Sequence, residues 1–203
     1  IEACGMWRGI HKILTDMGYE VKLANPKKTH DIACKKKTDQ VDAKILADLL
    51  RTKYLPEVWI PDEQTLRFRD LTRHKSNLTR LRTQIQGKIK GYLLRNGKKY
   101  RKSWNEKTLS VLAAEDPDIK NLVNVYKSLH EEEKEVMKRI KQTARNKKET
   151  TLLMSMPGIA EFSSLVILAE IGDIQRFRSP KELVSYAGLC CGIYPVSYTH
   201  LTL

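Results

Sequence analysis

The sequence predicts a mixed α/β segment at residues 1–60, two long helices over residues 62–148 and a small helical unit at residues 151–194. Three observations predict this order. Strand-like alternation and helical spacing of apolar residues share the first segment, whereas the second has long stretches with almost no Gly or Pro. The third has helical spacing and is rich in small residues. Apolar residues form 41% of the 203-residue chain, an ordinary share for a folded globular protein.

The first segment combines helix and strand signals. Residues 1–5 have the pattern of a strand's exit, and apolar residues near helical spacing predict a short helix over residues 7–17. Residues 19–24 alternate between polar and apolar side chains, as a half-buried strand does. Pro56 and Pro61 mark the end of this α/β segment.

Two apolar seams predict the long helices of the second segment. In the first helix the seam recurs every seven residues, at Leu71, Leu78, Ile85 and Tyr92. In the second it steps by three and four, and Glu133 alone interrupts it: Ile119, Leu122, Tyr126, Leu129, Glu133, Val136 and Ile140. Such a repeat keeps one stripe against a partner helix. Either an antiparallel pair within the chain, with a loop near residues 96–117, or a coiled coil between chains follows.

Positive charge is concentrated on the first long helix. The chain carries a formal net charge of +13, and residues 63–103 hold thirteen Lys and Arg against two acids, a balance of +11. A solvated helix face normally interleaves both signs, so we expect this helix to follow a phosphate backbone, with an unpartnered basic face as the alternative. The candidate nucleic-acid ligands are Arg67, Arg73, Lys75, Arg80, Arg82, Lys88, Lys90 and Arg95.

Other classes of protein are disfavoured by composition. The longest apolar stretch, around residues 165–169, is too short to span a bilayer, so no membrane partner is expected. The four cysteines form no Cys-x-x-Cys pair and no histidine pair has zinc spacing. Reduced thiols of a cytoplasmic protein are therefore the expectation.

Two acids at the start of a third predicted helix are candidates for chemistry. Apolar spacing places the beginning of this helix near Thr38 or Asp39. Asp39 and Asp42 are three residues apart, which puts both carboxylates on one helix face, roughly 5–6 Å apart. Like charges this close repel unless a cation lies between them, and hard oxygen ligands suit Mg²⁺ or Mn²⁺. Spacing alone also fits acids placed in a first turn to complement the helix dipole.

The string from Lys37 to Ala47, with residues 1–7 and the strand-like residues 21–26, resembles the DEDD transposases of the IS110 insertion-sequence family. The resemblance implies an α/β RuvC-like (RNase H-type) fold for residues 1–60, carried here in part. It also implies four catalytic acids (Asp, Glu, Asp, Asp) that bind Mg²⁺ or Mn²⁺. Carried over by position, Glu2 matches the Glu, Asp39 the third acid and Asp42 the last, and the first Asp would precede Ile1.

The resemblance continues through residues 156–160, 169–174 and 187–189, which are similar to the family's C-terminal transposase domain. Pro157-Gly158-Ile159 also resembles a helix-hairpin-helix turn, in which backbone N–H groups meet a phosphate. In the family this motif usually ends with a second Gly after the Gly-Ile pair, and this chain has Ala160 there. A plain turn between two helices is therefore the alternative to a phosphate-binding hairpin. The family's serine nucleophile would fall near Ser197, to which we assign no role.

The resemblance implies a transposase of a bacterial insertion sequence that cuts and rejoins DNA by metal-assisted chemistry. DNA, a structured guide RNA and further copies of the chain, joined through the coiled coil, are the partners it implies. A Holliday-junction-type nuclease and a non-catalytic basic coiled-coil protein that binds nucleic acid are the alternatives. Residues 195–203 fit a sequencing adapter, and we interpret them as read-through after a truncated C-terminal domain. With one acid and a trusted serine missing, we expect this chain to bind nucleic acid without catalysing strand exchange.

Overall fold

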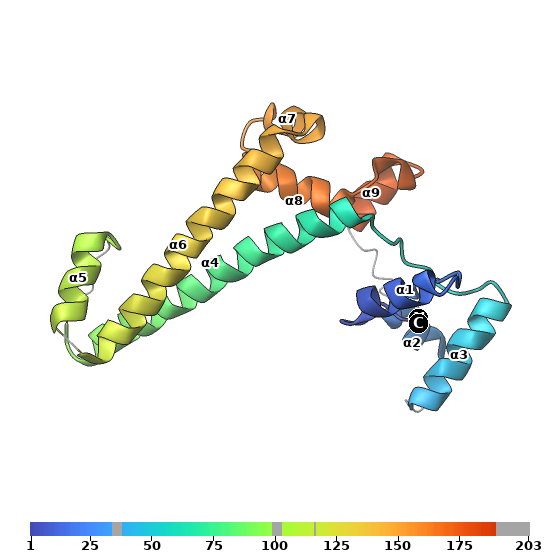
Figure 1. The fold of residues 1–203 in the computed structure, drawn as a ribbon, viewed down its shortest axis with the longest axis horizontal. Coiled ribbons are helices and arrows are strands. Elements are labelled where there is room, and N and C mark those ends of the chain that lie inside the picture. Colours follow the sequence, from blue (N-terminus) through green and yellow to red (C-terminus); the bar gives the residue numbers. More distant parts are fainter. Residues whose placement is uncertain (34–37, 99–102, 116, 190–203) are drawn as a thin grey trace, which may run out of the picture. The chain divides into compact units, whose positions relative to one another are not determined.

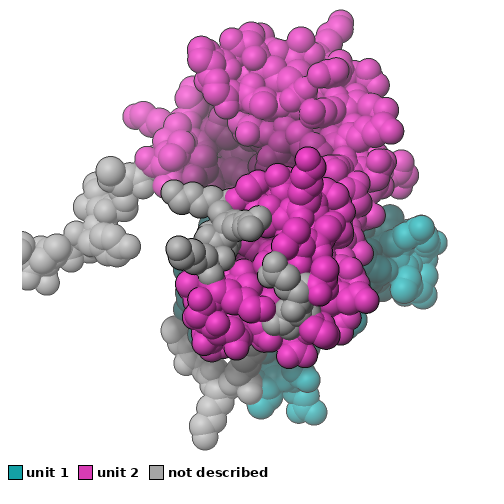
Figure 2. All heavy atoms as spheres, turned by 90° about the vertical axis from the view of Figure 1, so that its left-hand side faces the viewer, with its two compact units in different colours: residues 1–62 teal, residues 63–203 magenta. Residues whose placement is uncertain are grey.

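The computed structural model describes residues 1–33, 38–98, 103–115 and 117–189. The chain divides into two compact units, Ile1–Asp62 and Glu63–Leu203, coloured separately in Figure 2. Both are built from helices in their described parts, and none of these helices combines the length and hydropathy needed to cross a lipid bilayer. Residues 195–203 and the basic residues Lys99, Arg101 and Lys102 lie outside the described ranges.

The α/β RuvC-like prediction for residues 1–60 is wrong. Where the structure describes this unit it contains no strand, only isolated bridges that pair Glu2 with Ala24 (parallel) and Ala24 with Glu57 (antiparallel). A strand needs a ladder of successive pairs, and here each pairing is interrupted within a few residues. After Glu2 the chain enters a helix at Trp7, and after Ala24 it enters one at Pro26. Beside Glu57, Pro56 has no N–H to donate.

Unit 1 instead carries three helices: α1 (Trp7–Asp16), α2 (Pro26–Ala33) and α3 (Asp39–Arg51). The helix expected at residues 7–17 is confirmed by α1. The side chain of Thr38 is the N-cap of α3 and accepts a hydrogen bond from the Val41 N–H at 3.3 Å, so α3 begins where the sequence predicts. Burial in this unit is centred on Leu23 and Ala24, whereas α1 and α3 have no fully buried residue.

Unit 2 is organised by an antiparallel pair of long helices, α4 (Glu63–Arg95) and α6 (Pro117–Arg145), which lie side by side in Figure 1. The two predicted seams close on each other within the chain. Ile89 and Leu93 of α4 share one buried cluster with Val123 of α6, and Leu78 shares a second with Ile140. Of the two alternatives, the structure contains the antiparallel pair within the chain. A homo-oligomer stays a prediction, but this apolar seam no longer supports it.

Shorter helices cover both ends of the α4–α6 pair. The expected loop contains α5 (Glu106–Glu115), whose Leu109 is buried against α6. At the other end lie α7 (Lys148–Met154), α8 (Glu161–Ile171), the 3-10 turn η1 (Ile174–Arg176) and α9 (Pro180–Tyr186). Leu165 of α8 is fully buried against Val136 and Ile140. Helix α8 therefore shares a core with the long helices.

Candidate nucleic-acid interface and acidic pair

The structure places Asp39 and Asp42 in the first turn of α3. The Asp42 N–H donates to the Thr38 carbonyl at 2.9 Å, which closes this turn. Asp39 is exposed and Asp42 half-buried, and within the described residues neither carboxylate forms an ion pair. By contrast, Asp48 in the same helix pairs with Arg51 at 3.5 Å. Two carboxylates without a cationic side chain at a helix N-terminus can accept an external cation.

Glu2 is not brought into a three-ligand group with these acids. Its backbone bridges to Ala24, and its side chain is half-buried. Over the described parts of the chain no three His, Cys, Asp or Glu side chains gather so that they could hold a metal ion. The structure therefore brings Asp39 and Asp42 into one helical turn, but it does not bring Glu2 to them as a third metal ligand.

Several of the basic residues expected to bind nucleic acid are used inside unit 2, and the first group surrounds Glu133. Its Oε2 accepts from Arg82 Nε at 2.7 Å, and its Oε1 accepts from Thr79 Oγ1 at 2.7 Å and lies 3.7 Å from Lys75 Nζ. Arg82 also donates to the Tyr126 hydroxyl at 3.3 Å. Burial opposes ionisation of Glu133, but the hydrogen bonds from Thr79 and Arg82 outweigh it and lower its pKa. The interruption of the apolar seam is thus a partly buried polar network.

A second group of basic residues holds the first turns of α4. Arg73 binds both carboxylate oxygens of Glu170 in α8, at 3.0 and 3.3 Å, and Arg67 pairs with Glu63 at 2.6 Å. Arg69, which the sequence did not single out, donates to the carbonyls of Ala169 (2.8 Å) and Glu170 (3.1 Å). Its side chain is only 14% exposed. Arg69 and Arg73 join α4 to the C-terminal end of α8, whereas Arg67 pairs within α4, and these contacts explain the charge of the three arginines without a ligand.

The remaining candidates form an exposed face towards the end of α4. Arg80, Lys88 and Arg95 lie about two helical turns apart, so they share one side of the helix, and we call them the α4 basic face. In the described structure none of the three forms an ion pair with an acid. A groove of about 730 Å³ lies beside Lys88 and Arg95 of this face, and it is lined by Gln84, Gly87, Lys88, Gly91, Tyr92, Arg95 and Leu122. Lys90 is exposed too, but on another side of α4.

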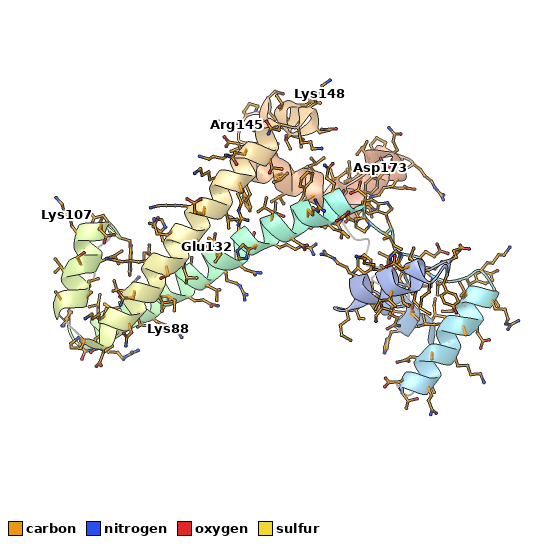
Figure 3. The ribbon with its side chains drawn as sticks, in the orientation of Figure 1. Lys88, Lys107, Glu132, Arg145, Lys148 and Asp173 are labelled. Atoms are coloured by element: carbon orange, nitrogen blue, oxygen red, sulfur yellow. The ribbon has the colours of Figure 1, made fainter. Side chains whose placement is uncertain are left out.

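A second basic surface escaped the sequence-based prediction. It comprises Lys134, Lys138, Lys141 and Arg145 of α6 together with Lys148 of α7, and we call it the α6–α7 basic surface. Figure 3 shows Arg145 and Lys148 at the end of the α4–α6 pair opposite to Lys88. The spacing of four, three and four residues between the α6 cations was the available signal. Nearby acids, among them Glu131 and Glu132, keep the local net charge low, so a count of charges along the sequence does not indicate this surface.

The Pro157-Gly158 motif forms the turn between α7 and α8. The Ile159 N–H donates to the Met156 carbonyl at 3.2 Å, and Gly158 has φ +88°, as a type II turn with proline before glycine requires. The carboxylate of Glu161 occupies the start of α8: a hydrogen bond from its own backbone N–H and one from Arg145 at 2.9 Å lower its pKa. A protein anion already meets this helix N-terminus, which favours the plain turn over a phosphate-binding hairpin.

Comparisons with known proteins identify relatives along most of the chain. Residues 3–96 match a family model of DEDD, IS110-type proteins described as transposase, and residues 150–194 match one described as transposase of the IS116/IS110/IS902 family. The chain is 28% identical over 193 residues to y4qE, a transposase-family protein of Sinorhizobium fredii, covering 91% of this chain and 47% of that protein. It is 23% identical over 200 residues to the transposase for insertion sequence element IS1111A of Coxiella burnetii, covering 93% and 55%. The chain spans about half the length of the curated relatives it matches.

Proposed function

Because the chain belongs to the IS110 family of transposases, we propose that its acidic pair serves the DEDD-type, metal-assisted cutting and rejoining of the DNA of a bacterial insertion sequence. That this chain by itself binds nucleic acid without catalysing strand exchange stays a prediction. The observation that carries this proposal is the pair of carboxylates in the first turn of α3, which no cationic side chain of the described chain neutralises. The junction nuclease and the non-catalytic binding protein are not favoured by the family matches.

The family implies a divalent ion, and the acidic pair fits one by donor chemistry. Asp39 and Asp42 offer hard oxygen atoms from a single turn, the ligand type that Mg²⁺ and Mn²⁺ prefer. Glu2 is proposed as a further ligand from its position in the sequence alone. When bound, such an ion stabilises charge on a scissile phosphate. The chain itself positions the two carboxylates, because the side chain of Thr38 caps the helical turn that carries both acids.

DNA is the proposed partner of the α4 basic face. Three cations that bind no acid, spaced over about 22 Å of helix, can contact phosphates without reading base sequence. Three phosphate contacts predict a slope of about −2.7 for log K against log salt, which is a loss of about 40-fold between 50 and 200 mM salt. A structured guide RNA is the alternative ligand of the same face, and anisotropy titrations with a DNA duplex and an RNA hairpin would separate the two.

Calorimetric titration with Mn²⁺ tests the metal site. We expect Asp39→Asn and Asp42→Asn each to weaken Mn²⁺ binding at least tenfold, because each removes one of the few charged ligands that define the site. Asp48→Asn is the matched control, since Asp48 lies in the same helix but pairs with Arg51. Unchanged Mn²⁺ affinity in both of the first two variants would contradict the proposed metal site.

A further inference from the structure

The α6–α7 basic surface has the composition of a site for a polyanion. Lys138 and Lys141 lie in its middle, both are exposed, and within the described residues neither forms an ion pair. At its edges Lys134 pairs with Glu131 at 2.8 Å and Arg145 with Glu161 at 2.9 Å. The side chains of Lys134 and Arg145 are 57% and 68% exposed. Water therefore weakens both ion pairs, and a phosphate can replace the acid in either of them.

The surface is hollowed along its length. One groove of about 420 Å³ is lined by Lys134, Met137, Lys138, Lys141, Gln142 and Arg145. A second, of about 510 Å³, continues from Arg145 across the start of α7 and is lined by Asn146, Lys147, Lys148, Thr151, Leu152 and Ser155 as well. The side-chain amides of Gln142 and Asn146 accompany the cations, as in surfaces that hold a phosphate backbone, whereas the hydroxyls of Thr151 and Ser155 already donate to backbone carbonyls. From Lys134 to Arg145 the stripe runs about 16 Å along α6, the axial length of about five phosphates of one B-DNA strand.

The side chains that line both grooves favour a duplex over a single strand. Proteins that bind single-stranded nucleic acid stack its bases on aromatic side chains. The lining of these two grooves includes no aromatic residue, and its apolar members are Met137 and Leu152. Lysines on flexible stems contact the outside of a duplex as point charges and need no exposed base.

We propose that the α6–α7 basic surface binds a second DNA duplex, so that one chain can hold two duplexes at once. This deepens the proposed function and rests on it, because the first duplex lies on the α4 basic face. The two surfaces share no residue. On α6 the groove of the α4 basic face reaches Leu122 and the nearest groove of the other surface begins at Lys134, about 18 Å further along the helix.

Native mass spectrometry of the full chain with a short DNA duplex counts duplexes per chain. We expect two per chain for the unaltered protein and one for the double variant Lys138→Gln/Lys141→Gln. Anisotropy at 0.1 M salt should show the affinity of the affected site falling by up to about 60-fold, because each lost phosphate contact removes about eightfold at that concentration. Circular dichroism and the melting temperature should not change, since both side chains are exposed.

A matched control removes the same charge elsewhere in unit 2. Lys107 lies on α5 and Lys181 on α9, and neither lines any of the three grooves, so the variant Lys107→Gln/Lys181→Gln should keep two duplexes per chain. The variant Lys88→Gln/Arg95→Gln should also reduce the count to one, through the other site. Two duplexes retained by Lys138→Gln/Lys141→Gln, or only one on the unaltered chain, would overturn the second site.

The outcomes separate the two proposals. If the Lys88→Gln/Arg95→Gln variant loses a duplex and the Lys138→Gln/Lys141→Gln variant does not, DNA binding by the α4 basic face stands and the second site is wrong. If neither variant changes the count, both are wrong. Binding of an RNA hairpin at least tenfold tighter than the DNA duplex, lost in Lys138→Gln/Lys141→Gln, would overturn the choice of DNA for this surface.

Discussion

Replacing Glu133 by alanine removes the acceptor around which the α4–α6 contact is organised. Its carboxylate accepts from Thr79 and Arg82 at 2.7 Å each, and its side chain is only 14% exposed. In the variant the Arg82 guanidinium, 22% exposed, stays in the interface without its counter-charge. A hydrogen bond to a charged group contributes about 1.5–3 kcal/mol, and removing one partner of a fully buried pair costs about 3–5 kcal/mol. For this partly buried site we expect a loss of about 2–3 kcal/mol in the free energy of unfolding.

Urea unfolding followed by circular dichroism measures this loss as a shift of the midpoint at constant m-value. The neighbouring Glu132→Ala is the control, because Glu132 is 53% exposed and its closest basic atom is His74 Nε2 at 3.8 Å. We expect its effect to stay within about 0.5 kcal/mol. Equal, small shifts for the two variants would refute the assignment of Glu133 as the centre of the interface.

The same network predicts a dependence on pH. Because the pKa of Glu133 is lower in the folded chain than its ordinary 4.5, its ionised form stabilises the fold above that pH. The contribution is lost as pH falls below 4.5 through the folded value. The difference in stability between the unaltered chain and Glu133→Gln should therefore shrink on acidification. A difference that stays constant from neutral pH into this acidic range would contradict the role of the carboxylate's charge.

Five further substitutions, at four residues, test local features, and each is followed by the same unfolding measurement. Gly158→Ala should destabilise by about 1–2 kcal/mol because of the φ of +88°, whereas Gly87→Ala, in an ordinary helical position with open space around it, should stabilise by about 0.5–1 kcal/mol. Arg69→Ala should cost about 2–3 kcal/mol through its two lost bonds to the end of α8, and Arg69→Lys should recover little, because an ammonium cannot reproduce the fork. Thr38→Ala should cost about 1 kcal/mol in unit 1 and speed amide exchange at Val41. Stabilisation by Gly158→Ala, destabilisation by Gly87→Ala, or full recovery by Arg69→Lys would contradict these assignments.

Local features were readable from the sequence because they depend on neighbours along the chain. Helix α3 begins at its cap, and α4 and α6 follow from their apolar spacing, since side chains three and four residues apart share a helix face. Asp39 and Asp42 lie in one turn for the same reason. Gly158, placed after a proline, indicated the turn between α7 and α8.

Tertiary packing decided what the sequence left open or suggested wrongly. The strand-like alternation of residues 19–24 produced only isolated bridges, because a strand exists through its partners and these pair over too few residues. Charge counting could not separate Arg69 and Arg82, which hold helices together, from Lys88 and Arg95, which face solvent. That division depends on which acids and carbonyls of distant segments each side chain meets. The sequence by itself determined the two long helices, their seams and the amount of charge, whereas only the folded chain determined which charges remain available to a ligand.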